Sequence, residues 1–190
     1  LPRGVAAYVG PSYKKIKTEI LPSTKHGLEM HGIFEDLHYF VGRRPPRRWN
    51  FAKAYKMPDS IENCMWFNNG FVIQFISQDI SHSGRGGNFD ALIVDEAGII
   101  DNDHLTTSVK PAVRGSNVKV FVDNHFFMSE HYASSTPLTK EGRWFIELEE
   151  QAILHPDEFK FITADGRFNL ANLAPGYFEN AKRTTLPLIY

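Results

Sequence analysis

Two adjacent carboxylates, Asp95 and Glu96, directly follow the apolar run Ala-Leu-Ile-Val at positions 91–94. A continuous apolar run without alternation predicts a strand that is buried on both faces, as in a parallel sheet covered by helices. Two charges at the end of such a strand are costly to desolvate unless something there uses them. Ligands bind outside the carboxyl ends of parallel strands, so the pair predicts a ligand site. By the Walker B pattern that the two acids form with this run, we assign Asp95 to a hydrated magnesium ion and Glu96 to the activation of a water molecule. The alternative is a plain strand terminus followed by a capped turn.

The same residues form the Walker B pattern of nucleotide hydrolases, in which four apolar residues precede Asp-Glu. The other half of such a site, a P-loop, requires Gly-Lys followed by Ser or Thr, so that backbone amides and the lysine bind phosphates. None of the 14 glycines is followed by lysine. The glycine-rich loop at 83–88 contains Arg85, but it precedes a strand and does not open a helix. Arg85 is a candidate for contact with a phosphate or a neighbouring subunit, and the alternative is a local ion pair with Asp90.

The segments around the acid pair predict strands and helices in alternation. Residues 5–9 form a short apolar run closed by Gly-Pro, which predicts a buried strand that ends in a turn. Ser12 is placed to cap a helix, which Pro22 would kink or restart. The Asn-Gly pair at 69–70 lies between two β-rich runs and predicts a tight hairpin. The elements predicted after the acid pair are a helix capped by Asp103 and ending near Gly115, strands over 118–122 and 132–134, and a helix over 142–153.

Length and composition favour one folded domain. The chain has 190 residues, of which 42% are apolar and 13% aromatic, enough to build a sizeable core. Because 21 Lys and Arg residues face 22 Asp and Glu residues, any attraction to nucleic acid or to a membrane has to be local. No apolar run approaches the ~20 residues that a membrane span needs. The single cysteine, Cys64, excludes an internal disulfide framework and a four-cysteine zinc site.

A basic segment between positions 41 and 57 contains no acidic residue and is interrupted by two prolines. Its basic residues are Arg43, Arg44, Arg47, Arg48, Lys53 and Lys56. The segment predicts an exposed loop, and its four arginines are candidates for contact with DNA phosphates. The alternative is a solvated loop whose charge keeps the protein soluble.

The order of these motifs resembles that of the large terminase subunit of tailed bacteriophages, the motor ATPase that drives DNA into the capsid. The matching segments are 8–13 after the first strand, 83–90 before the Walker B run, 95–97, and 134–137 followed by Gly142. The resemblance covers nearly the whole chain, and the order and spacing of the motifs carry it. It implies an α/β fold of the P-loop NTPase type, with a three-layer, mostly parallel sheet that is incomplete and carries a β-hairpin insertion. Residues 1–158 would be part of the ATPase domain, and 159–190 its C-terminal part, leading toward a nuclease domain.

In this family the P-loop precedes the segment that residues 5–12 resemble, so we expect it upstream of Leu1. The resemblance implies ATP and Mg²⁺ as cofactors, and it makes Ser134, Ser135 and Thr136 the motif that couples hydrolysis to movement. Hydroxyl groups at a strand end beside the catalytic strand can hydrogen-bond the attacking water or the γ-phosphate. The alternative is a Ser/Thr turn before Pro137.

The partners implied by the resemblance are double-stranded DNA, the portal protein, the small terminase subunit and further copies of the chain in the assembled motor. The expected location is the host cytoplasm, with transient binding at the capsid portal and no membrane association. Without its P-loop the chain is expected to be inactive alone. Two other functions stay open: a helicase-like DNA-dependent ATPase, and a nonenzymatic DNA-binding or assembly module whose nucleotide site has decayed.

Overall fold

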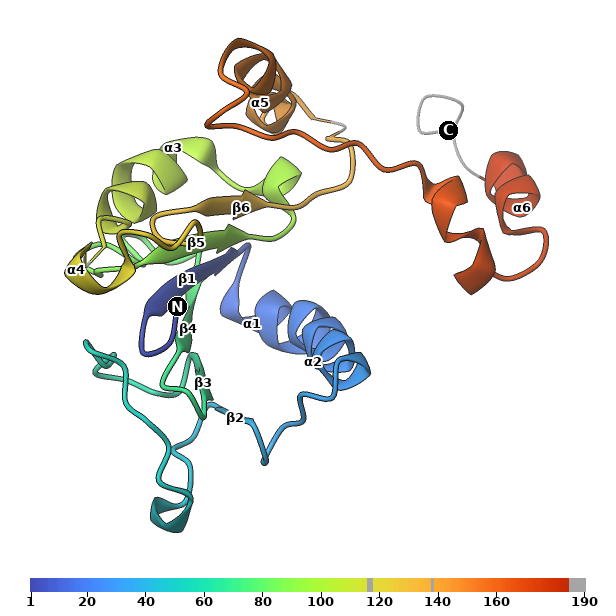
Figure 1. Ribbon diagram of the computed structural model, residues 1–190. Coiled ribbons are helices and arrows are strands. Elements are labelled where there is room, and N and C mark those ends of the chain that lie inside the picture. The colour runs from blue at the N-terminus through green and yellow to red at the C-terminus, as the bar shows by residue number, and fades with distance from the viewer. Residues whose placement is uncertain (116–117, 138, 185–190) are drawn as a thin grey trace. The chain divides into compact units, whose positions relative to one another are not determined.

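The computed structural model describes residues 1–115, 118–137 and 139–184, which form two compact units, 1–142 and 143–190 (Figure 1). The first unit contains a six-stranded sheet with the strand order β2-β3-β4-β1-β5-β6. The strands are β1 (Val5–Gly10), β2 (Tyr39–Val41), β3 (Cys64–Phe67), β4 (Val72–Ser77), β5 (Ala91–Val94) and β6 (Glu130–Tyr132). Strands β4, β1, β5 and β6 are parallel, whereas β2 and β3 add two antiparallel pairings. The predicted α/β fold with a mostly parallel sheet is therefore confirmed.

The hairpin predicted at the Asn-Gly pair joins β3 to β4. Trp66 lies opposite Val72, and Gly70 has a φ of +83°, which a glycine adopts without steric cost. The Asn69 side chain accepts a hydrogen bond from the Phe71 amide at 2.9 Å, which closes the turn. Because β4 also pairs along its whole length with β1, the hairpin is part of the main sheet.

One helical layer follows β1 and covers one face of the sheet. It consists of α1 (Tyr13–Lys15), a π-helical segment η1 (Ile16–Ile20) and α2 (Leu21–Met30). As predicted, Ser12 caps the first turn, since its hydroxyl oxygen accepts a hydrogen bond from the Lys15 amide at 3.1 Å. The α-helix resumes as α2 directly after the π-helical segment, with Pro22 in its first turn, and the backbone stays helical through Ile20 and Leu21.

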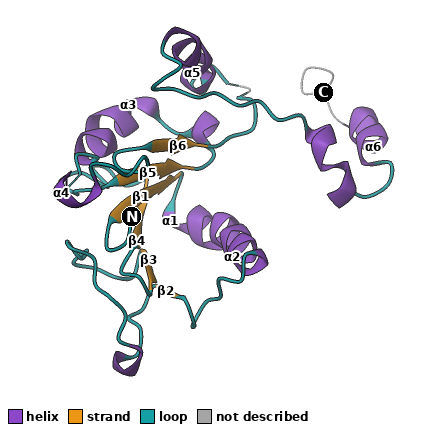
Figure 2. Ribbon diagram, in the orientation of Figure 1, coloured by secondary structure: helices purple, strands orange, loops and turns teal. Residues whose placement is uncertain are grey.

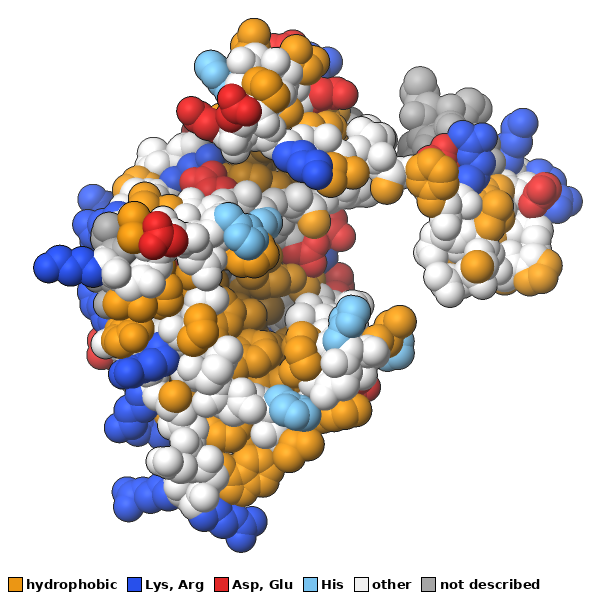
Figure 3. All heavy atoms as spheres, in the orientation of Figure 1, with side chains coloured by type: hydrophobic (Ala, Val, Ile, Leu, Met, Phe, Trp, Pro, Cys, Tyr) orange, Lys and Arg blue, Asp and Glu red, His pale blue; other side chains and the backbone are white. Residues whose placement is uncertain are grey.

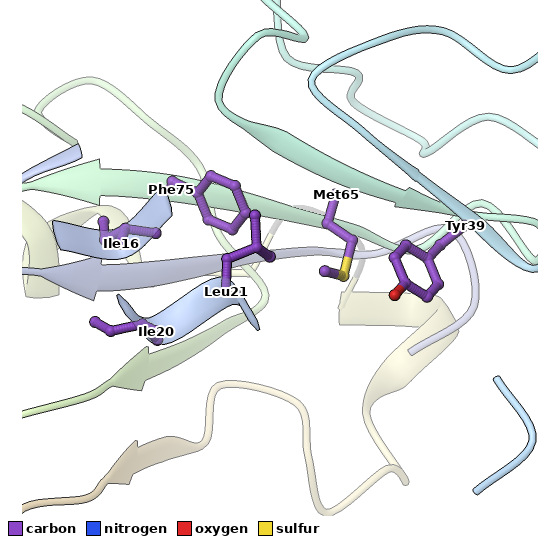
Figure 4. Packing of buried hydrophobic residues seen from close by; sticks show 6 residues of the cluster. All are labelled: Ile16, Ile20, Leu21, Tyr39, Met65 and Phe75. Carbon is purple, nitrogen blue, oxygen red and sulfur yellow. The ribbon is translucent and has the colours of Figure 1, made fainter. Parts of the chain in front are cut away.

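This layer buries a cluster of large side chains against the sheet (Figure 4). The cluster contains Ile16, Ile20 and Leu21 from the helical layer and Tyr39, Met65 and Phe75 from β2, β3 and β4. These three strand residues belong to one face because the pairings Tyr39–Phe67, Met65–Ile73 and Met65–Val41 place them in register.

A second helical layer lies on the opposite side of the sheet (Figures 1 and 2). Its elements are α3 (Asn102–His104), η4 (Leu105–Val109), η5 (Lys110–Ala112) and α4 (Val118–Phe121). The predicted cap Asp103 is wrong by two residues: the Asp101 carboxylate accepts hydrogen bonds from the Asp103 and His104 amides at 2.8 and 3.1 Å.

Two strand predictions are corrected. The segment predicted as a strand over 118–122 forms the short helix α4, because β6 takes the place beside β5. The strand predicted at 132–134 begins two residues earlier, since Leu92 pairs with Glu130 and Val94 with Tyr132. Backbone pairing to β5 therefore ends before Ser134.

The second unit contains α5 (Arg143–Leu154), η6 (Gly166–Asn172) and α6 (Tyr177–Thr184), none of which has a buried residue. The helix predicted over 142–153 is confirmed as α5. The division at 158/159 expected from the resemblance stays a prediction. None of the helices in the described part of the chain has the length and apolar character that a membrane span requires.

Candidate functional site

The acid pair lies at the carboxyl end of an interior strand. β5 pairs on one side with β1 and on the other with β6, and Val94, the last residue of β5, is fully buried. The chain leaves β1 toward one helical layer and leaves β5 toward the other (Figure 1). Strand order reverses at such a point, and the crevice outside these strand ends is where open α/β sheets bind ligands. Asp95 and Glu96, both half-buried, lie at this crevice.

The Asp95 carboxylate is held by two hydrogen bonds, one on each oxygen. The Tyr8 hydroxyl of β1 donates to Oδ2 at 3.1 Å, and the Glu96 amide donates to Oδ1 at 2.9 Å. Burial raises the pKa of Tyr8 and the Asp95 charge raises it further, so the tyrosine stays protonated and acts as the donor.

Glu96 adopts a left-handed backbone conformation, with φ 55° and ψ 39°. Its carbonyl accepts the Ile99 amide at 2.9 Å and so opens a single helical turn, η3 (Ala97–Ile99). A non-glycine residue in this region costs about 1–2 kcal/mol, and such residues concentrate at functional sites. The turn thus carries strain at the position assigned to the water-activating carboxylate.

Ser134 contacts the turn that follows Glu96. The Gly98 amide donates to the Ser134 hydroxyl oxygen at 3.0 Å, and the Ala97 amide donates to the Ala133 carbonyl at 3.0 Å. A Cβ on Gly98 would lie 2.9 Å from this hydroxyl oxygen and 2.8 Å from Pro137 Cγ, so the two segments are in close contact. Of the three predicted coupling residues, Ser134 meets the acid-pair turn, while Ser135 and Thr136 are exposed.

Arg85 lies exposed in the glycine-rich loop, with its guanidinium group 3.5 Å from the His82 ring nitrogen. Its predicted local partner, Asp90, is fully buried and serves the sheet: Asp90 Oδ2 accepts the Val5 amide at 2.9 Å at the start of β1. The side chain of Arg85 is therefore accessible at the surface, as a phosphate or subunit contact requires.

The predicted basic loop is exposed and is anchored by aromatic rings. Arg43 forms an ion pair with Asp36, and its guanidinium carbon lies 4.9 Å from the centre of the Phe40 ring. Phe40 in turn packs edge-on against the rings of Trp49 and Phe51 at 5.6 and 5.5 Å. Arg44, Arg47 and Arg48 are exposed, the last two on a short 3-10 turn, η2 (Arg47–Trp49), and basic side chains gather over this loop (Figure 3).

The donor set at Asp95 fits a hydrated divalent cation that has further ligands from a substrate. Within residues 1–115, 118–137 and 139–184, no three His, Cys, Asp or Glu side chains form a complete metal cage. Neither Asp95 nor Glu96 forms an ion pair with another described residue. Magnesium is commonly held by one or two carboxylates together with waters and substrate phosphates, so one carboxylate with free lone pairs meets its requirement.

No family model, curated protein or solved structure matches this chain. The functional assignment therefore depends on the residues and their geometry. Two hydrogen bonds connect residues of three neighbouring strands near their carboxyl ends. Tyr8 of β1 bonds to Asp95 after β5, and Gly98, in the turn after Asp95, bonds to Ser134 after β6.

Sequence reasoning missed the roles of Tyr8 and Gly98. Tyr8 lies opposite Ile93 in the β1–β5 register, so its side chain shares a sheet face with Asp95, two residues beyond Ile93. Nothing local to Tyr8 specifies that register. For Gly98 the sequence did offer a signal, namely a glycine two residues after the acid pair. The structure shows why a glycine is needed there, because another segment of the chain comes close to it.

Proposed function

We propose that this chain is part of the ATPase domain of a DNA-packaging motor of the terminase large-subunit type. The supporting observation is the acid pair, which ends an interior parallel strand. Asp95 is hydrogen-bonded to β1, and the residues on either side of the pair, Val94 and Ala97, are hydrogen-bonded to Ala133 at the end of β6. Its proposed substrates are ATP and double-stranded DNA. Its proposed partners are the portal, the small terminase subunit and further copies of itself, in the host cytoplasm and at the capsid portal.

Each residue of the site has a distinct proposed role. Asp95 would hold the hydrated Mg²⁺ through the lone pairs that its two hydrogen bonds leave free. Glu96 would orient the attacking water and accept its proton. MgATP, when bound, supplies the scissile phosphate bond and the neutralisation of its charge. Arg85 would contact a phosphate or a neighbouring subunit.

The contact between Ser134 and Gly98 supports the proposed coupling role. A change at Glu96 on loss of the γ-phosphate would be transmitted through the η3 turn to the Gly98 amide and from there to Ser134. The segment 134–137 then reports the state of the acid pair. In this arrangement Ser134 is the direct contact, and Ser135 and Thr136 would act from the exposed side of the segment.

The outer side of β6 is a position at which a strand carrying a P-loop could join the sheet. Among the strands of the described part of the chain, β6 is the last in the sheet and pairs only with β5, so its outer side can accept another strand. We propose that a strand carrying the P-loop pairs there. If that strand runs parallel to β6, its phosphate-binding turn would lie at the carboxyl ends of the strands, near Ser134 and the acid pair.

The test uses Glu96→Gln in a protein that carries this chain together with its P-loop. Steady-state ATP hydrolysis should fall by about 10²–10⁴-fold, because a general base is removed, while ATP binding is retained. Glu150→Gln, an exposed site on α5, is the matched control and should hydrolyse ATP like the wild type.

Wild-type turnover by Glu96→Gln would refute the assignment of the base. A wild-type protein that binds DNA but hydrolyses no ATP would instead favour the nonenzymatic module. ATP-dependent unwinding of a DNA duplex would favour the helicase-like enzyme.

A further inference from the structure

We propose that Tyr8 is a positioning residue, which sets the orientation of the Asp95 carboxylate and thereby the affinity of this carboxylate for a divalent cation. The inference rests on the proposed role of Asp95 as a metal ligand. It assigns Tyr8 a function that reaches the reacting groups only through Asp95.

The strand register brings the two side chains together. Tyr8 pairs with Ile93, and Asp95 lies two residues further along the chain, so both side chains leave the same face of the sheet. The tyrosine hydroxyl donates to Oδ2 at 3.1 Å, while Oδ1 accepts the Glu96 amide at 2.9 Å. With one donor fixed on each oxygen, rotation of the carboxyl group about its Cβ–Cγ bond is restricted.

The Tyr8 ring packs against one ring of the sheet and borders a cavity that is lined partly by the helical layer. The Tyr8 ring meets the Phe75 ring edge-on at 6.1 Å with an interplanar angle of 79°. Thr24 of α2 lines the same cavity as the Tyr8 ring. The contact with Phe75 therefore limits the ring on the side of the sheet, and space remains beside it on the side of the cavity.

An apolar cavity of about 110 Å³ adjoins the ring and is lined by Tyr8, Ile20, Leu21, Thr24 and Ile93, among others. Free volume on this side means that packing alone does not hold the ring in one place. The bond to Asp95 is thus needed for the geometry and is not merely a by-product of close packing. Removing the hydroxyl should free both groups without overfilling the core.

Hydrogen bonds to metal ligands orient those ligands, and their removal typically weakens metal binding by about 10–100-fold. The experiment measures Mn²⁺ binding to the 190-residue chain by water-proton relaxation, with Mn²⁺ alone as the probe. Tyr8→Phe removes one oxygen and keeps the ring, and we expect a Kd for Mn²⁺ about tenfold higher. Asp95→Asn should lose the site.

Tyr39→Phe is the matched control. Tyr39 lies in the core cluster against which Tyr8 packs, and its buried hydroxyl has no hydrogen-bond partner among the described residues. The substitution removes the same atom from the same core without touching Asp95, so Mn²⁺ affinity should stay at the wild-type value. Thermal unfolding of all variants shows that the chain remains folded under the conditions of the titration.

Equal Mn²⁺ affinity of Tyr8→Phe and the wild type, with the site lost in Asp95→Asn, would overturn the role of Tyr8 and leave that of Asp95 intact. An equal loss of affinity in Tyr8→Phe and Tyr39→Phe would also overturn it, because the effect would then be a general one on the core. If Asp95→Asn binds Mn²⁺ like the wild type, or the wild type binds none, the metal assignment in the proposed function fails as well.

Discussion

At the scale of single residues, Glu96 combines a charged side chain with a backbone conformation that favours glycine. Its φ of 55° begins the η3 turn, which directs the chain from the end of β5 toward Gly98 and its contact with Ser134. A protein selected for stability alone would place glycine here, because glycine adopts this conformation without a steric penalty. The strain is consistent with a position where the carboxylate is needed.

Comparison of Glu96→Gly with Glu96→Ala measures this strain. Both variants lack the carboxylate, but only glycine relieves the left-handed conformation. We expect the free energy of unfolding to be higher for Glu96→Gly than for Glu96→Ala by about 1 kcal/mol, as determined by urea denaturation. Equal stabilities would show that the turn bears no such strain in solution.

The sequence was sufficient to locate the acid pair but not its partners. The apolar run at 91–94 followed by two acids predicted both a buried strand and a site at its end, because burial and charge are visible locally. The link from Tyr8 to Asp95 depends on which strands are neighbours and in which register. Such pairing is set by the whole sheet, so no pattern near either residue could predict it.

At the scale of elements, the helical layer packs onto the end of β1 at a glycine. A Cβ on Gly10 would lie only 2.6 Å from Ile16 Cγ1, closer than real side chains approach. The first turn of η1 therefore sits on the strand end, and Gly10 makes room for the Ile16 side chain. This contact holds the helical layer next to Tyr8 and Asp95.

A double-mutant cycle tests that contact. Gly10→Ala should lower the free energy of unfolding by about 1–3 kcal/mol through overpacking, and Ile16→Ala by about 2–5 kcal/mol through loss of buried volume. The double variant should lose less than the sum, because the atom that clashes is gone. Additive losses in chemical denaturation would mean that the two residues do not share this contact.

Elements with strong local signals were predicted well, and those decided by competition were not. The Asn-Gly turn and the Ser12 cap both depend on residues within one turn of the feature. By contrast, residues 118–121 have strand-like composition but form α4, since the place beside β5 belongs to β6. Propensity cannot decide which of two segments pairs with a given strand.

At the scale of the whole molecule, a net charge of −1 conceals a separation of charges. Exposed arginines extend along the loop that carries η2, whereas the acid pair lies at the carboxyl ends of β1 and β5. Under the proposed function, this loop would attract DNA phosphates at a surface separate from the carboxylates proposed to bind the metal.

Replacement of Arg43, Arg44, Arg47 and Arg48 by Gln in the complete motor tests whether this loop binds DNA. If it does, the salt dependence of duplex binding should become shallower by roughly one in slope for each DNA phosphate that the variant no longer neutralises. A variant with Lys14, Lys17, Lys140 and Lys160 replaced by Gln has the same net charge and should keep the wild-type slope. An unchanged slope in the arginine variant would leave the loop as a solvated segment.

The central position of β1 also determines when the sheet can form. Val5 pairs with Val72 on one side of β1 and Ala6 pairs with Ala91 on the other, and both partners are synthesised long after β1. The strand therefore stays unpaired until they are available. Contacts so distant along the chain slow folding, and an unpaired apolar strand is exposed to aggregation in the meantime. A ribosome-bound intermediate that ends before Ala91 would therefore expose the unpaired side of an apolar strand. It would need protection by a chaperone until β5 is synthesised.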